Sequence, residues 1–320
     1  MSKTMKTWLI VAASLVVIGL IAFAVIMTIN DWDFTKLGTG KFETSTYELN
    51  EEFCNISIKT DTADIVFVPS DDEKCKVVCY EAENVKHSVS VADGVLTVNV
   101  VDTRKWYEYI GINFGAPKIT IYLPEAEYAS LIIEERTGDI EISNDFKFES
   151  IDVSVSTGDV KCYASAAEAI KIAASTGDIS VADISVDLLE LSISTGNVTV
   201  SGVTCEGDVK VGVSTGKVSL SDIVCQSVIS SGSTGDIFLK NVIAAEKFSI
   251  KRSTGCVKFD GSDAAEIFVE TDTGDVEGSL LTDKVFITKT DTGDISVPSS
   301  ITGGRCEITT DTGDIKITIN

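Results

Sequence analysis

Six aspartates near the C-terminal end of the sequence have the residue type and spacing to bind a cation. They flank the glycine in the last three copies of a DTGD motif: Asp272, Asp275, Asp291, Asp294, Asp311 and Asp314. If the copies stack at ~4.8 Å, these carboxylates form two short ladders that calcium could bridge through oxygen ligands. The alternative is that each aspartate caps a turn and is screened by water and salt, which requires no metal. Asn197, Lys217 and Cys256 replace the second acid in other copies, so calcium at this end is the one cofactor that the sequence suggests.

The same motif recurs along the chain and sets its architecture. From Arg136 onward a Thr-Gly pair repeats every 19 or 20 residues, with its glycine at Gly138, Gly158, Gly177, Gly196, Gly216, Gly235, Gly255, Gly274, Gly293 and Gly313. Apolar residues alternate on both sides of each pair, as Ile179 and Val181 do, and this is the period of a β-strand. Each repeat therefore holds two strands and a turn whose glycine tolerates positive φ. The sequence predicts an all-β fold, a single-stranded parallel β-solenoid (β-helix) with coils of 19 to 20 residues, over residues 136–320.

An uncharged run before the repeats predicts one transmembrane helix. Residues 7–29 contain no charged side chain, and at ~1.5 Å per residue they are long enough for a bilayer core. Lys3 and Lys6 precede the run and acids follow it, so the positive-inside rule predicts residues 1–6 as a cytoplasmic tail, residues 30–41 as a tether and the rest as extracellular. A cleaved signal peptide is the alternative, but the run is long for one and no small-residue cleavage site closes it. We therefore expect an uncleaved signal anchor that makes a single pass through the cell membrane.

Residues 42–135 keep the strand alternation but lose the strict period, so we expect an irregular N-terminal β region that caps the solenoid. Residues 62–65, TADI, stand where later copies have TGDI, and Asp93 and Gly94 between alternating runs predict a hairpin. Four aromatic residues gather in the segment that follows the hairpin: Trp106, Tyr107, Tyr109 and Phe114. They form either a binding loop, because aromatic rings supply large contact areas, or a plug over the open end. The need of a solenoid for a cap favours the plug.

At this point the sequence resembles a known family. The run ADIVFVPSDD, the later IYLPE and the repeated STGDI and DTGDI units resemble DUF4097, a family of β-strand-repeat proteins that are described as surface adhesins and occur mainly in Gram-positive bacteria. The resemblance covers residues 42–320. It implies a single-stranded parallel β-solenoid on the cell surface or in the envelope, relatives linked to envelope stress, and no catalytic residues.

The charge balance excludes nucleic acids as partners. The chain has 49 acidic and 26 basic residues, a net charge of -23, and would repel DNA, RNA and anionic membrane surfaces. The acids recur with the repeat and do not converge on one spot. His87, the lone histidine, has no neighbouring serine or cysteine at the spacing of a nucleophile motif, so we interpret it as an isolated surface residue.

These observations predict that the protein is not an enzyme. We expect a membrane-anchored extracellular solenoid that binds a cell-surface protein or glycan like an adhesin, or that acts as an envelope scaffold. One alternative is an envelope-stress sensor or accessory protein acting with a partner, because six intracellular residues hold no signalling module. A glycan-active β-helix enzyme is a weaker alternative, since fold alone does not imply function.

The cysteines and the last strand lead to two further expectations. Cys162 and Cys306 fall on apolar phases and are predicted to be core residues. Cys205 and Cys225 occupy the same position in adjacent coils, at a distance that permits a disulfide. The chain ends in DIKITIN, an alternating strand with no polar cap, so an unpaired edge is predicted to allow concentration-dependent end-to-end self-association.

Overall fold

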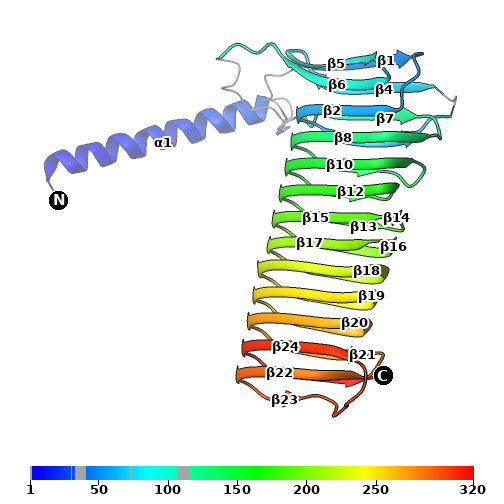
Figure 1. Cartoon of the computed structure of the whole chain (residues 1–320). Helices are drawn as coiled ribbons and strands as arrows, with labels where there is room; N and C mark the ends of the chain where they lie inside the picture. The colour runs from blue at the N-terminus through cyan, green and yellow to red at the C-terminus, as the bar shows by residue number, and fades with distance from the viewer. Residues whose placement is uncertain (1, 30, 33–40, 72–73, 107–114) are drawn as a thin grey trace.

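The chain forms a rod of stacked β-strands with one helix at its N-terminal end (Figure 1). This computed structural model describes residues 2–29, 31–32, 41–71, 74–106 and 115–320. Successive coils pair in parallel along the rod. The predicted all-β solenoid with one preceding apolar helix is therefore confirmed.

The helix is α1 (Lys3–Ile29), and it contains the whole of the predicted uncharged run. Its length and composition are sufficient to cross a membrane, and none of its most apolar window is buried against the rest of the protein. Of the predicted tether, the structure describes only Asp31, Trp32 and Lys41. Met27 is the one buried residue of the helix, and an apolar helix whose other side chains are exposed is what a bilayer span requires.

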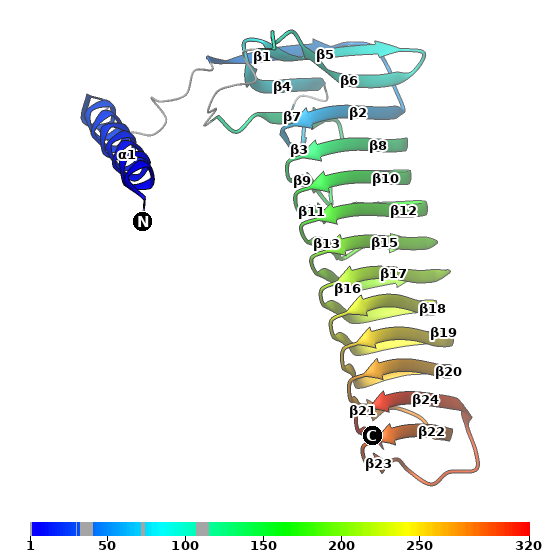
Figure 2. The same cartoon turned by 90° about the vertical axis from the view of Figure 1, so that its left-hand side faces the viewer.

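Each coil has one long side and two shorter ones, and Figure 2 shows the long strands stacked one above another along the rod. Face A is made of the strands that precede the Thr-Gly corner: β8 (Glu127–Thr137), β10 (Lys147–Thr157), β12 (Ser165–Thr176), β15 (Leu188–Thr195) and β17 (Asp208–Thr215). Face B follows the corner, with β9 (Ile140–Ile142), β11 (Val160–Cys162) and β13 (Ile179–Ala182). Side C contains β14 (Ser185–Val186), and longer strands run around the corners between sides: β16 (Val198–Cys205), β18 (Val218–Thr234), β19 (Ile237–Thr254) and β20 (Val257–Thr273).

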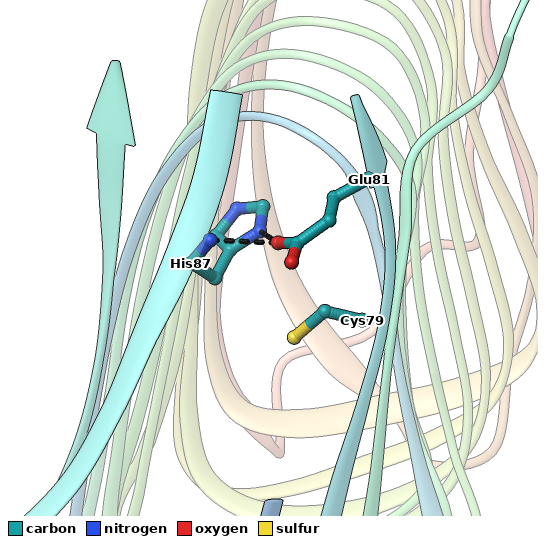
Figure 3. A group of neighbouring side chains, drawn as sticks. All are labelled: Cys79, Glu81 and His87. Atoms are coloured by element: carbon teal, nitrogen blue, oxygen red, sulfur yellow. Dashed lines mark hydrogen bonds and ion pairs between the residues drawn. The ribbon is translucent and has the colours of Figure 1, made fainter. Parts of the chain in front are cut away.

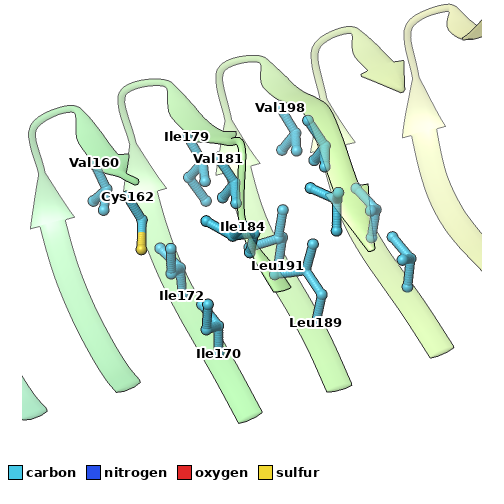
Figure 4. Close-up of a cluster of buried hydrophobic side chains, with 14 of the residues drawn as sticks. Val160, Cys162, Ile170, Ile172, Ile179, Val181, Ile184, Leu189, Leu191 and Val198 are labelled. Carbon is cyan, nitrogen blue, oxygen red and sulfur yellow. The ribbon is translucent and has the colours of Figure 1, made fainter. Parts of the chain in front are cut away.

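Equivalent residues of successive coils pair in register, which stacks apolar side chains into ladders inside the rod. On face B, Val160 pairs with Ile179, and Ile179 pairs with Val198. On face A, Ile170 pairs with Leu189. All five are fully buried, and Figure 4 shows how they line the interior. Because burial of each such side chain contributes ~1.5–3 kcal/mol, the ladders supply most of the driving force for folding.

The motif glycines form the corner between faces A and B. All ten have φ between 128° and 155°, a conformation in which other residues are strained. The coils also approach too closely for a side chain, since a Cβ on Gly177 would lie 2.0 Å from the carbonyl oxygen of Gly158. Glycine is therefore required for two reasons, its backbone conformation and the tight stacking of the corners.

A second corner, between face B and side C, was not identified from the sequence. Its residues have left-handed φ values from 52° to 63°: Asp183, Gly202, Asp222, Asn241 and Gly261. The Asn241 amide donates a hydrogen bond of 3.0 Å to Asp222 Oδ1 one coil away. Asp, Asn and Gly all tolerate this conformation. The corner therefore has the same backbone geometry in successive coils although its residue type changes.

The C-terminal coils are stacked in a different order from their order in the sequence. They consist of β21 (Val276–Leu280), β22 (Lys284–Thr292), β23 (Ile295–Ser296), β24 (Gly304–Thr312) and β25 (Ile315–Ile319). β24 pairs with β20 on one side and β22 on the other, and β25 lies in the same way between β21 and β23. Figure 1 shows the red β24 above the orange β22. The last coil of the sequence is therefore inserted between the two coils that precede it.

This insertion overturns the expectation of a free C-terminal edge. The strand in DIKITIN is paired on both sides, by β21 and β23. Among the described strands, β22 and β23 form the lower edge of the rod instead, and their Val285, Ile287 and Ile295 side chains are exposed. End-to-end self-association stays a prediction, but it would have to use β22 and β23.

The N-terminal end combines the first coil with an antiparallel cap. The strands are β1 (Phe42–Leu49), β2 (Asn55–Thr62), β3 (Asp64–Pro69), β4 (Cys75–Ala82), β5 (Val85–Ala92), β6 (Val95–Asp102) and β7 (Lys118–Leu123). β2 and β3 continue faces A and B, with Ala63 at the corner position. Face A is extended by β6 and then by antiparallel β5, and the predicted turn at Asp93 and Gly94 joins these two strands. Face B is extended by β7, β4 and β1 in that order. The cap is therefore two short sheets that enclose the top of the core.

Two charged residues interrupt the apolar ladder on face A. Glu135 is 4% exposed, its Oε1 accepts a 3.1 Å hydrogen bond from the Thr137 N–H, and its Oε2 has no partner among the described residues. Arg252 is 1% exposed and donates to Val213 O and Ser230 Oγ. Its guanidinium fills the space left by Gly232, where a Cβ would lie 1.8 Å from Nη1. Burial lowers the pKa of Arg252 and raises the pKa of Glu135 to about 8.

The raised pKa of Glu135 predicts that the rod loses stability as the pH rises. In the unfolded chain this carboxyl ionises in its ordinary range, whereas in the folded chain it stays protonated up to about pH 8. Stability is therefore fully present at acid pH and is lost progressively up to that value. Glu135→Gln should remove this loss and raise the free energy of unfolding at about pH 9 by about 1–3 kcal/mol, with a smaller effect at about pH 5. Denaturant unfolding at the two pH values measures the difference, with the exposed Glu141→Gln as control. An unchanged pH dependence in Glu135→Gln would refute this account.

Candidate functional site

The acidic residue of each TGD motif links one coil to the next. The Asp159 N–H donates a 2.8 Å hydrogen bond to Asp139 Oδ1, and the Asp178 N–H donates one of the same length to Asp159 Oδ1. At the C-terminal end the chain of bonds follows the inserted order, from the Asp314 N–H to Asp275 Oδ1 and from the Asp294 N–H to Asp314 Oδ1. The Asp294 N–H and then Lys316 hold the pKa of Asp314 below its usual range. These carboxylates therefore have a structural role, the capping of backbone N–H groups in the neighbouring coil.

The other three terminal aspartates also form a ladder. Strand register places Asp311 between Asp272 and Asp291, and all three side chains are exposed. Lys289 lies 3.0 Å from Asp291 Oδ1. Within the described residues, neither ladder brings three carboxylates close enough to share one ion. Calcium binding at this corner stays a prediction, and the capping of backbone N–H groups explains the Asp275 and Asp314 carboxylates without it.

Most of the predicted aromatic loop cannot be compared with the structure. Tyr107, Tyr109 and Phe114 lie outside the described residues. Trp106 is 77% exposed at the end of the described segment. Both interpretations of this loop, binding surface and plug, stay predictions.

A groove crosses the first coils of the rod where side C meets face A. It has a volume of about 950 Å³ and is lined by the starts of β8, β10 and β12 and by β14 and the end of β16. Its floor contains the Tyr128 and Phe148 rings, whose centroids are 5.7 Å apart, and the small side chain of Ala166. The rings are fixed, because both are at most 4% exposed and the Tyr128 hydroxyl donates to Pro124 O at 2.9 Å.

The rim of this groove is mostly acidic. Its exposed carboxylates come from four of the five levels of the rod that line it, all except that of β12: Glu127, Glu149, Asp187 and Glu206. Lys147 is the one basic residue in the lining. An elongated concavity with a fixed apolar floor and an acidic rim is suited to an extended ligand that carries positive charge. The sequence contained no motif for it, because its residues occupy ordinary turn and strand positions in separate coils.

A buried cluster of reactive side chains lies in the N-terminal cap, and it corrects the interpretation of His87. This residue is 3% exposed, not a surface residue. Its Nδ1 lies 2.9 Å from Glu81 Oε2, which also accepts the His87 backbone N–H at 2.7 Å, and its Nε2 lies 2.9 Å from Thr60 Oγ1. The Cys79 side chain, on β4, points toward Glu81 and His87 (Figure 3). The ligand atoms of Cys79, Glu81 and His87 all lie within 4.8 Å of one another.

These three residue types could form a cysteine nucleophile with its base, but burial argues against that role. Cys79 and Glu81 are both fully buried, so a substrate cannot reach the sulfur. Burial, together with Glu81, raises the pKa of the Cys79 thiol to about 12, so it is not the thiolate that attack requires. The sequence signal for this cluster was the i, i+2 spacing of Cys79 and Glu81, which places both on the inner side of one strand.

Five of the other cysteines are also buried, whereas Cys54 is exposed and Cys256 is half-buried. Cys162 and Cys306 are fully buried, as predicted, and burial raises the pKa of both thiols to about 12. Cys205 and Cys225 occupy adjacent coils as expected, but both are free thiols. The sulfur of Cys205 contacts Asp187 O at 3.3 Å instead.

Comparisons with known proteins give a family and a set of similar solved structures. The family model Toastrack DUF4097 matches residues 53–212 and 206–320. A candidate lipid-binding protein from Parabacteroides distasonis shares 14% sequence identity, with 88% of this chain and 98% of that chain covered and a TM-score of 0.45. A candidate adhesin from Bacteroides fragilis shares 16% identity, with 87% and 97% covered and a TM-score of 0.38. A candidate cell adhesion protein from Clostridium sporogenes shares 13% identity, with 88% and 100% covered and a TM-score of 0.26. No curated protein matches the chain.

Proposed function

Because the chain belongs to the Toastrack family DUF4097, we propose that it is a non-catalytic surface rod, held in the cell membrane by α1, that binds extracellular partners in an adhesin-like way. The lysines before the apolar run and the acids after it support an orientation with the rod outside the cell. In this arrangement the stacked coils form a rigid spacer, and the side surface of the rod is exposed outside the cell at a distance from the bilayer.

The observation that carries the proposal is the acidic groove across the first coils. Its carboxylates lie on four of the five coils that line the groove, so an extended chain lying along it meets them in succession, with a gap only at β12. Tyr128 and Phe148 are buried in the floor and offer no open ring face for stacking against a sugar. The acidic rim also disfavours anionic polymers. A protein segment rich in lysine or arginine therefore fits the groove better than a neutral glycan or teichoic acid.

Binding by the full-length chain in nanodiscs tests this function. The probes are collagen, a polylysine peptide, peptidoglycan and teichoic acid. We expect the two polypeptides to bind in a salt-sensitive manner, because exposed charges are screened. Glu149→Gln combined with Glu206→Gln should weaken this binding roughly tenfold, the sum of two modest surface interactions.

A matched pair of acids outside the groove serves as control. Glu141→Gln combined with Glu190→Gln removes the same charge from exposed positions on faces B and A. This pair should leave binding almost unchanged. If both double variants lose affinity equally, binding depends on net charge and the groove is not the site. If the chain retains only peptidoglycan or teichoic acid, the proposed ligand class is wrong.

A further inference from the structure

The buried cluster in the cap has the composition of a metal site. It contains a thiol, an imidazole and a carboxylate, from Cys79 and Glu81 on β4 and His87 on β5. Ligand atoms bound to one tetrahedral zinc ion lie ~3.3–3.8 Å apart, as bonds of ~2.0–2.3 Å require. Because the three atoms already lie within 4.8 Å of one another, side-chain adjustments of ~1 Å would bring them to a common ion.

Neighbouring residues orient these side chains as the outer partners of a metal site do. The contact of His87 Nε2 with Thr60 Oγ1 turns the other ring nitrogen, Nδ1, toward the cluster. Ser45 Oγ donates to Glu81 Oε1 at 2.6 Å, which fixes the carboxylate. The Tyr47 hydroxyl donates to His87 O at 2.7 Å and holds the backbone of β5. Hydrogen bonds of this kind fix the tautomer and direction of ligands in known metal centres.

We propose that Cys79, Glu81 and His87 bind one divalent transition-metal ion, of which zinc is the best fit. Thiolate and imidazole ligands together favour zinc over the hard ions calcium and magnesium, which prefer oxygen ligands alone. The ion replaces the direct contact between His87 Nδ1 and Glu81 and displaces the proton of the Cys79 thiol. It leaves one coordination position for a water molecule or a neighbouring hydroxyl group.

The ion would join the two sheets of the cap. β4 extends face B and β5 extends face A, and in the described structure the two strands pair only at Ala82 and Val85. A metal bridge from Cys79 and Glu81 to His87 would reinforce the hydrogen bonds that Glu81 and Tyr47 already make with His87 between the two sheets. Because all three side chains are buried, the ion would enter during folding or through a transient opening of the edge strands β1 and β5.

Cobalt substitution in the full-length protein tests the site. The chain is unfolded and refolded in detergent with cobalt(II), and unbound metal is removed. We expect one cobalt ion per chain and a thiolate-to-cobalt charge-transfer band in the near ultraviolet, both of which excess zinc removes. Cys79→Ala should lose the band and the bound ion. Cys75→Ala should keep both, because Cys75 is a buried thiol on the same face of β4 but outside the cluster.

The outcomes separate a metal site from a buried hydrogen-bonded network. Refolded wild-type protein that retains no cobalt or zinc would overturn the proposal, as would a charge-transfer band that persists in Cys79→Ala. Metal content measured on wild-type protein isolated directly from cells adds an independent readout. Zinc present there and absent from Cys79→Ala supports the site, whereas equal amounts in the two proteins contradict it.

Discussion

Replacing Gly177 with valine should destabilise the rod by about 3–5 kcal/mol, as the sum of backbone strain and overpacking. Gly177 has a φ of 135°, which a β-branched residue does not tolerate. Its side chain would also overlap the carbonyl oxygen of Gly158, only 2.0 Å from the added Cβ. Because the corners stack in direct contact, relief of the clash would require two coils to separate.

Gly212→Val is the matched control for this substitution. Gly212 is also a strand glycine of the solenoid, but a Cβ there meets no atom closer than 4.0 Å and its φ is not positive. Denaturant unfolding of the two variants and the wild type compares their stabilities. We expect a small change for Gly212→Val, and equal stabilities for the two variants would show that the corner does not demand glycine.

Replacing Lys284 with methionine should destabilise the terminal coil by about 3–5 kcal/mol, because it leaves a buried carboxylate without its cation. Lys284 Nζ lies 2.6 Å from Asp263 Oδ1, and both side chains are at most 10% exposed. Asp263 Oδ2 already has no partner among the described residues. The pair reaches from β22 to β20 past the inserted β24, whose Gly304 is the register partner of Lys284 and approaches the Ala265 carbonyl oxygen so closely that a Cβ would lie 1.7 Å from it.

Hydrogen exchange locates this effect within the rod. In Lys284→Met we expect faster exchange in β22 and β23, the coil that the pair fastens, and little change in the coils before β20. Asp263→Asn in the same chain should recover most of the loss, because no buried charge then remains. Lys289→Met, which removes an exposed cation from the same strand, should change little. Protection of β22 that equals the wild type in Lys284→Met would contradict this role.

The repeat allowed most of the fold to be predicted from the sequence. A constant glycine every 19 or 20 residues with strand alternation on both sides determines a coil, and in-register stacking follows from the need to bury the apolar positions. The order of the last coils could not be predicted in this way. Strands β22 and β24 carry nearly the same pattern, so either could pair with β20 as far as the ladders are concerned. The structure distinguishes the two strands by the buried pair of Lys284 and Asp263 and by Gly304, where a Cβ would lie 1.7 Å from the Ala265 carbonyl oxygen. Strand β22 has Lys284 at this register position, and no periodicity reveals either feature.

The candidate sites were predicted less well, for a related reason. The residues of the groove come together through the stacking of coils, and those of the buried cluster come together through the fold of the cap. Neither set forms a local sequence motif. His87 was interpreted as a surface residue because no nucleophile motif accompanies it in the sequence, yet the β5 strand turns it inward toward Glu81 and Thr60. Arg252 likewise fits inside the core only because Gly232, one coil away, has no side chain. The acids of the TGD motif were identified as turn residues, but their bonds to the next coil required the structure.

The most direct test of the account is the position of the rod relative to the membrane in intact cells. An epitope inserted after the exposed Ser299 marks the far end of the rod, and a second epitope at the N-terminus marks the other side of α1. Antibodies applied to intact and to permeabilised cells detect each epitope, and membrane fractionation shows whether the two stay together. The account predicts that the rod epitope is accessible on intact cells, that the N-terminal epitope requires permeabilisation, and that both remain in the membrane fraction on one chain. A rod epitope that is accessible only after permeabilisation, or that is released from the membrane without α1, would contradict the proposal of a membrane-anchored surface rod.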